Sequence, residues 1–154
     1  MKTSEQLRYA ILALQREGNR GLIGALKPLG ITPAQAEVLR VLHQYEPLSL
    51  AGLGELLICE NGTGPSRLVD RLVEAGAVQR TTGETDRRSV TLVLTPKGRE
   101  LSAAVAHVEE TLYATIDAVT AGQPVEEMLA LARRMLAGSA AGDALARRAA
   151  HAIP

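Results

Sequence analysis

The residues of this sequence best suited to bind a charged partner are arginines in two short segments. Arg87 and Arg88 follow Asp86 in GETDRRS, between two runs that alternate like strands. Side chains in a turn at this place do not pack in a core, so the two guanidinium groups are available to an anion. Asp86 would orient one of them through a bidentate pair. Such a turn is by itself typical of solvated charge, but a narrow one also fits the minor groove of duplex DNA. Which arginine enters the groove is left open.

The second segment, PSRLVDRLVEAG, covers residues 65–76 and has helical periodicity. Its apolar positions form one face and its polar positions the other. Arg67 and Arg71 are four residues apart and therefore project from the same side. We expect Ser66, Arg67 and Arg71 to face the major groove, where arginine binds guanine O6 and N7. Thr63 and Ser66 are expected to contact the phosphate backbone.

Local start and stop signals predict the elements that position these residues. An amphipathic helix is predicted over 4–27, and a second begins where Thr32 caps it and Pro33 opens it. A short third helix starts at Ser49, and strands are predicted over 77–82 and 89–95. Two short helices joined by a glycine-containing turn and followed by a hairpin form a winged helix-turn-helix.

Further helices are predicted after the hairpin. An apolar seam from Leu101 to Val119 runs over about five turns and needs a partner. Residues 125–136 form another amphipathic helix, and the alanine-rich 138–154 is expected to be a terminal helical turn or a frayed tail. The predicted fold class is mainly α with a small β-hairpin wing.

Composition restricts where charge can act. The 154 residues carry 17 basic and 17 acidic side chains, so no global field indicates nucleic acid. Between residues 63 and 99, however, seven basic residues stand against four acidic ones. This local surplus predicts binding that weakens steeply with salt. No export signal or membrane-spanning run is recognisable, so a cytoplasmic protein without a membrane partner is expected.

The order of elements, with RLVDRLVEAGAVQR followed by DRRSVTLVLTPKGRE, resembles the MarR family of bacterial transcriptional regulators. The resemblance implies one domain over 1–154, in which 1–30 and 100–154 are dimerisation helices and 33–99, here called the reading head, binds DNA. It also implies a homodimer on a pseudo-palindromic operator and a ligand pocket between the reading head and the dimerisation helices. Pro65 departs from the family pattern, so the recognition helix either starts late or has a distorted first turn.

By this resemblance the protein is a repressor released by a small molecule. Tyr9, Tyr45 and Tyr113 are candidate ligand-binding residues, because they fall on the first, second and fifth helices, which line the family's pocket. A tyrosine on an amphipathic helix is also typical of a core position with a wet hydroxyl.

The same residues allow alternative functions. Cys59, the single cysteine, is interpreted as a buried small hydrophobe, with a redox-sensing regulator as the alternative. A winged-helix dimeric adaptor without DNA binding is a second alternative. No phosphate loop, catalytic set or histidine pair is present, so we expect neither an enzyme nor a cofactor or metal site.

Overall fold

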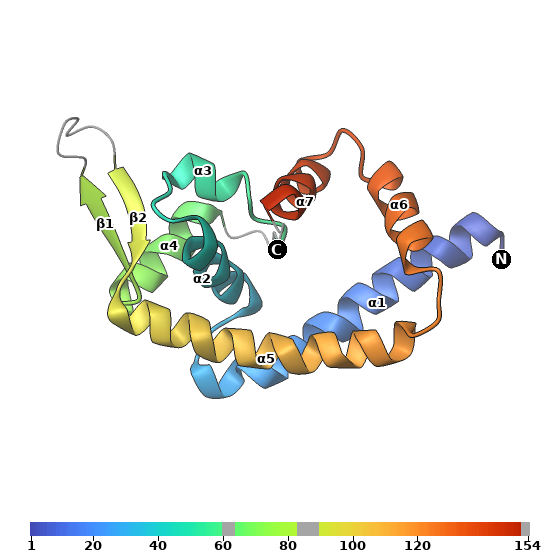
Figure 1. Cartoon of the computed structure of the whole chain (residues 1–154), viewed down its shortest axis with the longest axis horizontal. Coiled ribbons are helices and arrows are strands. Elements are labelled where there is room, and N and C mark those ends of the chain that lie inside the picture. The colour runs from blue at the N-terminus through green and yellow to red at the C-terminus, as the bar shows by residue number, and fades with distance from the viewer. Residues whose placement is uncertain (60–63, 83–89, 152–154) are drawn as a thin grey trace.

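The structure, a computed structural model, describes residues 1–59, 64–82 and 90–151 (Figure 1). The elements, in chain order, are α1 (Thr3–Leu26), η1 (Lys27–Leu29), α2 (Pro33–Tyr45), α3 (Leu50–Gly54), α4 (Pro65–Glu74), β1 (Val78–Thr82), β2 (Val90–Leu94), α5 (Pro96–Thr120), α6 (Val125–Met135) and α7 (Ala140–His151). The predicted class, mainly α with a β-hairpin, is confirmed.

Local capping sets the helix starts that the sequence predicts. At the start of α2, the Thr32 hydroxyl accepts from the Gln35 backbone N–H at 3.3 Å, and the Gln35 side chain accepts from the Thr32 N–H at 2.9 Å. The Ser49 hydroxyl caps α3 by accepting from Gly52 at 3.0 Å. Thr95 caps α5 in the same way. These bonds satisfy N–H groups that have no partner within their helix.

The two strands form an antiparallel hairpin in which Val78 lies opposite Leu94 and Thr82 opposite Val90. Leu48 adds one bridge to the other edge of β2, where the Leu92 N–H donates to the Leu48 carbonyl at 2.7 Å. This bridge ties the segment between α2 and α3 to the hairpin, so the reading head closes around its own core.

The main core lies inside the reading head. Its buried residues are Ala34, Val38, Leu39, Val41, Leu42, Leu53, Leu56, Leu68, Val69, Leu72, Ala77, Val78, Leu92 and Leu94. A smaller cluster of Leu26, Ala36 and Val105 joins α1, α2 and α5. The reading head is therefore held together by α2, α3, α4 and both strands, and it is joined to the long helices mainly by the packing of α5 along α2.

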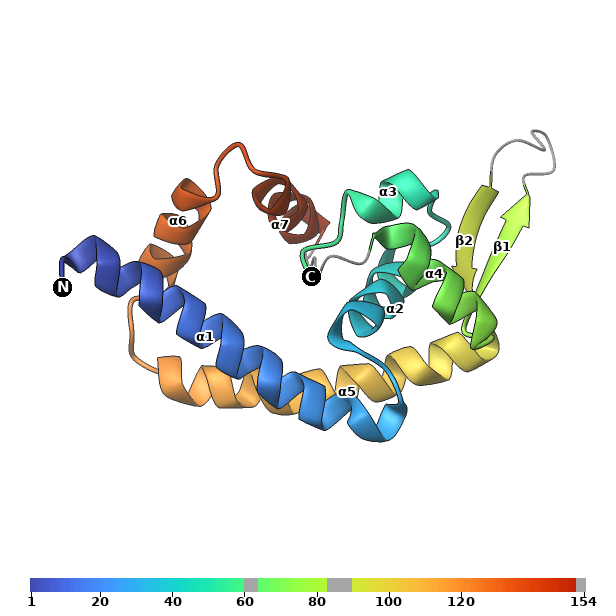
Figure 2. The same cartoon turned by 180° about the vertical axis from the view of Figure 1, so that it is seen from behind.

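The long helices leave apolar side chains exposed. Helix α5 runs from the base of the hairpin to the opposite end of the molecule (Figures 1 and 2). Its predicted seam is buried at Val105, but Ile116 is 48% exposed and Val119 76% exposed. Helix α6 buries none of its side chains within the chain. None of the helices in residues 1–59, 64–82 and 90–151 is long and apolar enough to cross a membrane.

The C-terminal segment corrects one expectation. In place of the helical turn or frayed tail predicted for residues 138–154, Ala140–His151 form a 12-residue helix. The Ser139 hydroxyl caps it by accepting from the Gly142 N–H at 3.1 Å, and Ala144 is only 1% exposed. The helix folds back beside the reading head (Figure 2), where two of its arginines bind other elements. Those long-range contacts stabilise an alanine-rich segment that is too short to be a stable helix alone.

Candidate nucleic-acid interface

Helix α4 presents a polar face that its packing leaves open. Leu68, Val69 and Leu72 are buried in the core of the reading head, while Ser66, Arg67 and Arg71 lie on the side that faces away from it, with both arginines exposed. The alternation follows from helical periodicity, which places residues three and four apart on one side. Figures 1 and 2 show α4 beside the hairpin at the outer end of the reading head.

The start of α4 accommodates Pro65. Gly64 occupies the N-cap and Pro65 the first helical position, where a missing N–H costs nothing. The Arg67 and Leu68 N–H groups both donate to the Gly64 carbonyl, at 3.1 and 3.3 Å. The helix begins at Pro65. Thr63 lies outside the described residues.

Arg67 and Arg71 differ from the neighbouring cations in their partners. Arg80 pairs with Asp70, Arg99 pairs with Glu46, and the Lys97 ammonium donates to the Ala75 carbonyl at 2.6 Å. Within the described part of the chain, neither Arg67 nor Arg71 forms an ion pair. Their guanidinium groups are the ones on α4 that remain available to an anionic partner.

An ion pair connects α4 to β1. The Arg80 Nη2 atom on β1 lies 2.5 Å from the Asp70 Oδ1 atom on α4. Both side chains are about half exposed, so the pair adds only about 0.2–1 kcal/mol to stability. It joins the exposed face of α4 to β1. The ten-residue separation gives no periodic signal, and sequence reasoning does not assign this connecting role to Asp70.

The base of the wing is fixed to α5. The Glu46 carboxylate accepts from the Leu94 N–H at 2.6 Å and also binds Arg99. The Thr95 hydroxyl donates to the Gly76 carbonyl at 2.6 Å. Beyond this base the strands project away from α5 (Figure 1), held side by side by the Thr81 and Thr91 hydroxyls at 2.8 Å. Asp86, Arg87 and Arg88 lie outside the described residues.

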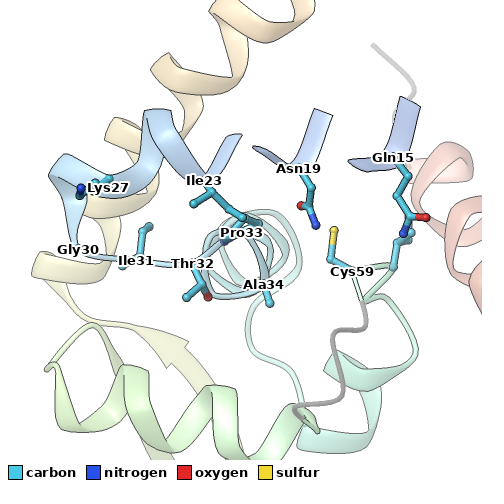
Figure 3. Close-up of a pocket in the computed structure, with 11 residues that line it drawn as sticks. Gln15, Asn19, Ile23, Lys27, Gly30, Ile31, Thr32, Pro33, Ala34 and Cys59 are labelled. Atoms are coloured by element: carbon cyan, nitrogen blue, oxygen red, sulfur yellow. The ribbon is translucent and has the colours of Figure 1, made fainter. Parts of the chain in front are cut away.

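A cavity of about 710 Å³ separates α1 from the reading head. Its walls come from α1, from the start of α2 and from the segment after α3 (Figure 3). The lining residues are Gln15, Asn19, Ile23, Lys27, Gly30, Ile31, Thr32, Pro33, Ala34, Ile58 and Cys59. Polar side chains from α1 therefore face apolar and backbone groups of the reading head.

The three candidate tyrosines do not meet in this cavity. Tyr9 is 51% exposed on α1 and Tyr113 is 53% exposed on α5. Tyr45 is half-buried on α2 and packs against the core of the reading head. Tyr113 lines a different, polar cavity of about 460 Å³ together with Arg40 and Arg148. None of the three tyrosines therefore lines the large cavity.

Cys59 is exposed, so its interpretation as a buried hydrophobe is wrong. It lies at the edge of the large cavity (Figure 3). Its backbone N–H donates to the Glu37 carboxylate. Partial desolvation of the thiol, followed by the Glu37 charge, raises its pKa from 9.0 to about 11, while Arg148 acts in the opposite direction. A raised pKa makes the reactive thiolate scarce at neutral pH, which argues against the redox-sensing alternative.

Comparisons with known proteins agree with this geometry. Residues 31–98 match a family model described as a winged helix DNA-binding domain. The chain is 30% identical over 112 residues to the organic hydroperoxide resistance transcriptional regulator of Bacillus subtilis, covering 73% of this chain and 76% of that protein.

Solved structures give the same result. The reduced form of MarR from E. coli superposes with a TM-score of 0.66 at 27% identity, covering 84% of this chain and 96% of that one. A mutant of E. coli MarR, with serine in place of a cysteine and in complex with operator DNA, gives a TM-score of 0.67 at 25% identity, covering 84% and 91%. The chain therefore belongs to the MarR family of winged helix-turn-helix DNA-binding transcriptional regulators, which are not enzymes.

Proposed function

We propose that this MarR-family regulator is a repressor that binds a pseudo-palindromic operator through α4. The observation that carries the proposal is the pair of guanidinium groups of Arg67 and Arg71, exposed on one side of α4 without an ion pair in the described chain. In the major groove these arginines would bind guanine edges, and Ser66 would contact a phosphate. The E. coli MarR mutant bound to operator DNA supports this use of the fold.

The wing supplies the second contact in this proposal. Arg87 or Arg88 enters the minor groove, Asp86 orients the other guanidinium, and Thr63 contacts the backbone beside α4. The projecting strands support this arrangement, because β1 ends at Thr82 and β2 begins at Val90, opposite each other and on the side of the hairpin away from α5.

A homodimer is needed to read both halves of such an operator. The apolar side chains exposed on the long helices support an interface built from α1, α5 and α6. Prominent among them are Leu14 at 74%, Val119 at 76% and Met128 at 60%. In this division, residues 1–30 and 100–154 form the dimer and 33–99 read DNA. The regulator would act in the cytoplasm.

An effector would occupy the cavity between α1 and the reading head. Its polar wall of Gln15, Asn19 and Lys27 suits a small molecule with an acceptor group, and its apolar wall includes Ile23 and Ile58. A ligand there would alter the angle between the dimerisation helices and the reading head, and so the spacing of the two recognition helices. The three tyrosines are secondary candidates: Tyr113 through its own polar cavity, and Tyr9 and Tyr45 through the helices that carry them.

Operator affinity of single arginine variants tests the proposal. With DNA from the gene's own promoter region, Arg67→Ala and Arg71→Ala should each raise Kd roughly 5- to 100-fold, because each loses about 1–3 kcal/mol of base recognition. Arg16→Ala, which removes the same charge from an exposed position on α1, is the matched control, used after analytical ultracentrifugation has shown that it still forms the dimer. Arg87→Ala with Arg88→Ala should also reduce the salt dependence of binding.

Two results would count against the proposal. If Arg16→Ala weakened binding as much as Arg67→Ala, only diffuse charge would be at work. If the unaltered protein showed no sequence preference even at low salt, the adaptor alternative would be favoured.

A further inference from the structure

The segment that leads from α3 to α4 is anchored on a buried carboxylate. Glu37, on α2, is only 8% exposed. Its Oε1 atom accepts from the Ile58 backbone N–H at 2.9 Å, and its Oε2 atom accepts from the Cys59 N–H at 2.8 Å. A charged residue in the buried stripe of α2 is costly unless its oxygens are well bonded. Both oxygens of Glu37 are used to hold the backbone that precedes the recognition helix.

The C-terminal helix completes this anchor. The Arg148 Nη1 atom on α7 lies 2.7 Å from Glu37 Oε1, and the two side chains are 32% and 8% exposed. The pair joins residues 111 positions apart. Because a buried carboxylate is stabilised by a charge-assisted bond to arginine, removing Arg148 leaves the Glu37 charge poorly compensated.

Further contacts fix α7 in this place. The Arg147 Nη1 atom donates to the Glu55 carbonyl at 3.1 Å and lies 3.4 Å from the Glu55 carboxylate. Gly142 lies so close to the end of α6 that an added Cβ would be 2.3 Å from the Leu136 carbonyl oxygen. The position of α7 thus depends on several independent contacts with the reading head and with α6.

We propose that Glu37 is a positioning residue for DNA recognition and that Arg148 completes it, so the C-terminal helix controls operator affinity from a distance. The proposal rests on the proposed function, in which α4 binds the operator. Ile58 and Cys59 also line the large cavity. Glu37 therefore contacts both the C-terminal helix and the backbone of Ile58 and Cys59, two residues that line the cavity and precede α4 in the chain.

The test uses the full-length protein and compares Arg148→Ala with Arg134→Ala, which removes the same charge from an exposed site on α6. Because α6 belongs to the proposed dimer interface, analytical ultracentrifugation first establishes that both variants dimerise as the unaltered protein does. Amide hydrogen exchange at Ile58 and Cys59 should accelerate about tenfold or more in Arg148→Ala and stay unchanged in Arg134→Ala. Operator Kd should rise about tenfold in Arg148→Ala alone, with dimerisation and circular dichroism unaltered. In a Glu37→Gln background, Arg148→Ala should add little further loss, because the two residues act as a unit.

The proposal would be overturned if Arg148→Ala and Arg134→Ala gave the same amide exchange rates and the same operator Kd. It would also be overturned if the losses of operator affinity from Glu37→Gln and Arg148→Ala were additive in the double variant. The exchange measurement needs no DNA, so it tests the anchor separately from recognition. A third outcome separates the two proposals: Arg67→Ala leaves operator affinity unchanged while Arg148→Ala accelerates exchange. The proposed function of α4 would then fail. The contact between Glu37 and Arg148 would be structural only, so the role of Glu37 in DNA recognition would also be overturned.

Discussion

The reading head and the long helices bury their apolar side chains to very different extents. In the reading head, Leu39, Leu42 and Leu72 are fully buried. On the long helices, Leu14 is 74% exposed, and the whole of α1 buries only Leu26. The reading head is complete within one chain, whereas the long helices carry the surface that a partner would cover. The same kind of side chain therefore contributes to folding in one region and to association in the other.

The sharpest test of this difference replaces one leucine in each region. Leu72→Ala removes a side chain with no exposed surface and should lower the free energy of unfolding by about 2–5 kcal/mol. Leu14→Ala should change the melting of the reading head little, but should raise the dimer dissociation constant at least about tenfold if that side chain is buried by a partner. Urea titration at fixed protein concentration measures the first effect and analytical ultracentrifugation the second. An unchanged dissociation constant for Leu14→Ala would remove α1 from the interface.

Replacing a glycine by alanine should change stability in opposite directions in the two regions. At Gly98, where α5 meets the start of the hairpin, an added Cβ would lie 1.9 Å from the Ala77 carbonyl oxygen. Gly98→Ala should therefore destabilise the protein by about 1–3 kcal/mol, since backbone must move. Gly18, in α1, has no atom within 4 Å of the same added group, so Gly18→Ala should raise helix stability by up to about 1 kcal/mol. Thermal melts compare the two, and a loss of stability in Gly18→Ala would indicate close packing of a partner on that face.

The smallest effect on stability at neutral pH is expected from the Cys59 thiol, which lies at the cavity between α1 and the reading head. Its folded pKa of about 11 exceeds the ordinary 9.0, so the unfolded chain ionises at lower pH than the folded chain. The contribution to stability is present below about pH 9 and is lost as pH rises toward 11. Alkylation by iodoacetamide at about pH 7.5 should be slower in the folded protein than in the same protein in urea, with mass spectrometry as the readout. Faster alkylation in the folded state would restore the redox-sensing alternative.

The elements could be predicted because their signals are local. The capping box at Thr32 and Gln35, the caps at Ser49 and Thr95, and the alternation of β2 each need only a few consecutive residues. For the same reason the exposed arginines of α4 follow directly from its periodicity.

Features that depend on distant partners were not predictable. The contact of the alanine-rich C-terminus with the reading head includes the pair of Arg148 and Glu37, and α4 is joined to β1 by the pair of Asp70 and Arg80. The prediction for Cys59 is wrong because a cysteine carries no local sign of exposure, and here a backbone bond to Glu37 decides its position. An isolated acid within the buried stripe of α2 is the one local signal that could have indicated the anchor.

The length of α5 has a mechanical consequence. Its 25 residues make a rod about 37 Å long at roughly 1.5 Å per residue. Pivoting such a rod by about 5° at one end displaces the other by about 3 Å, close to the rise of one base pair. Because the wing stands on one end of α5 and Ile116 and Val119 lie toward the other, substitutions among those apolar residues would retune which half-site spacing the protein selects. Operator preference could then diverge between related proteins without any change in the side chains that touch DNA.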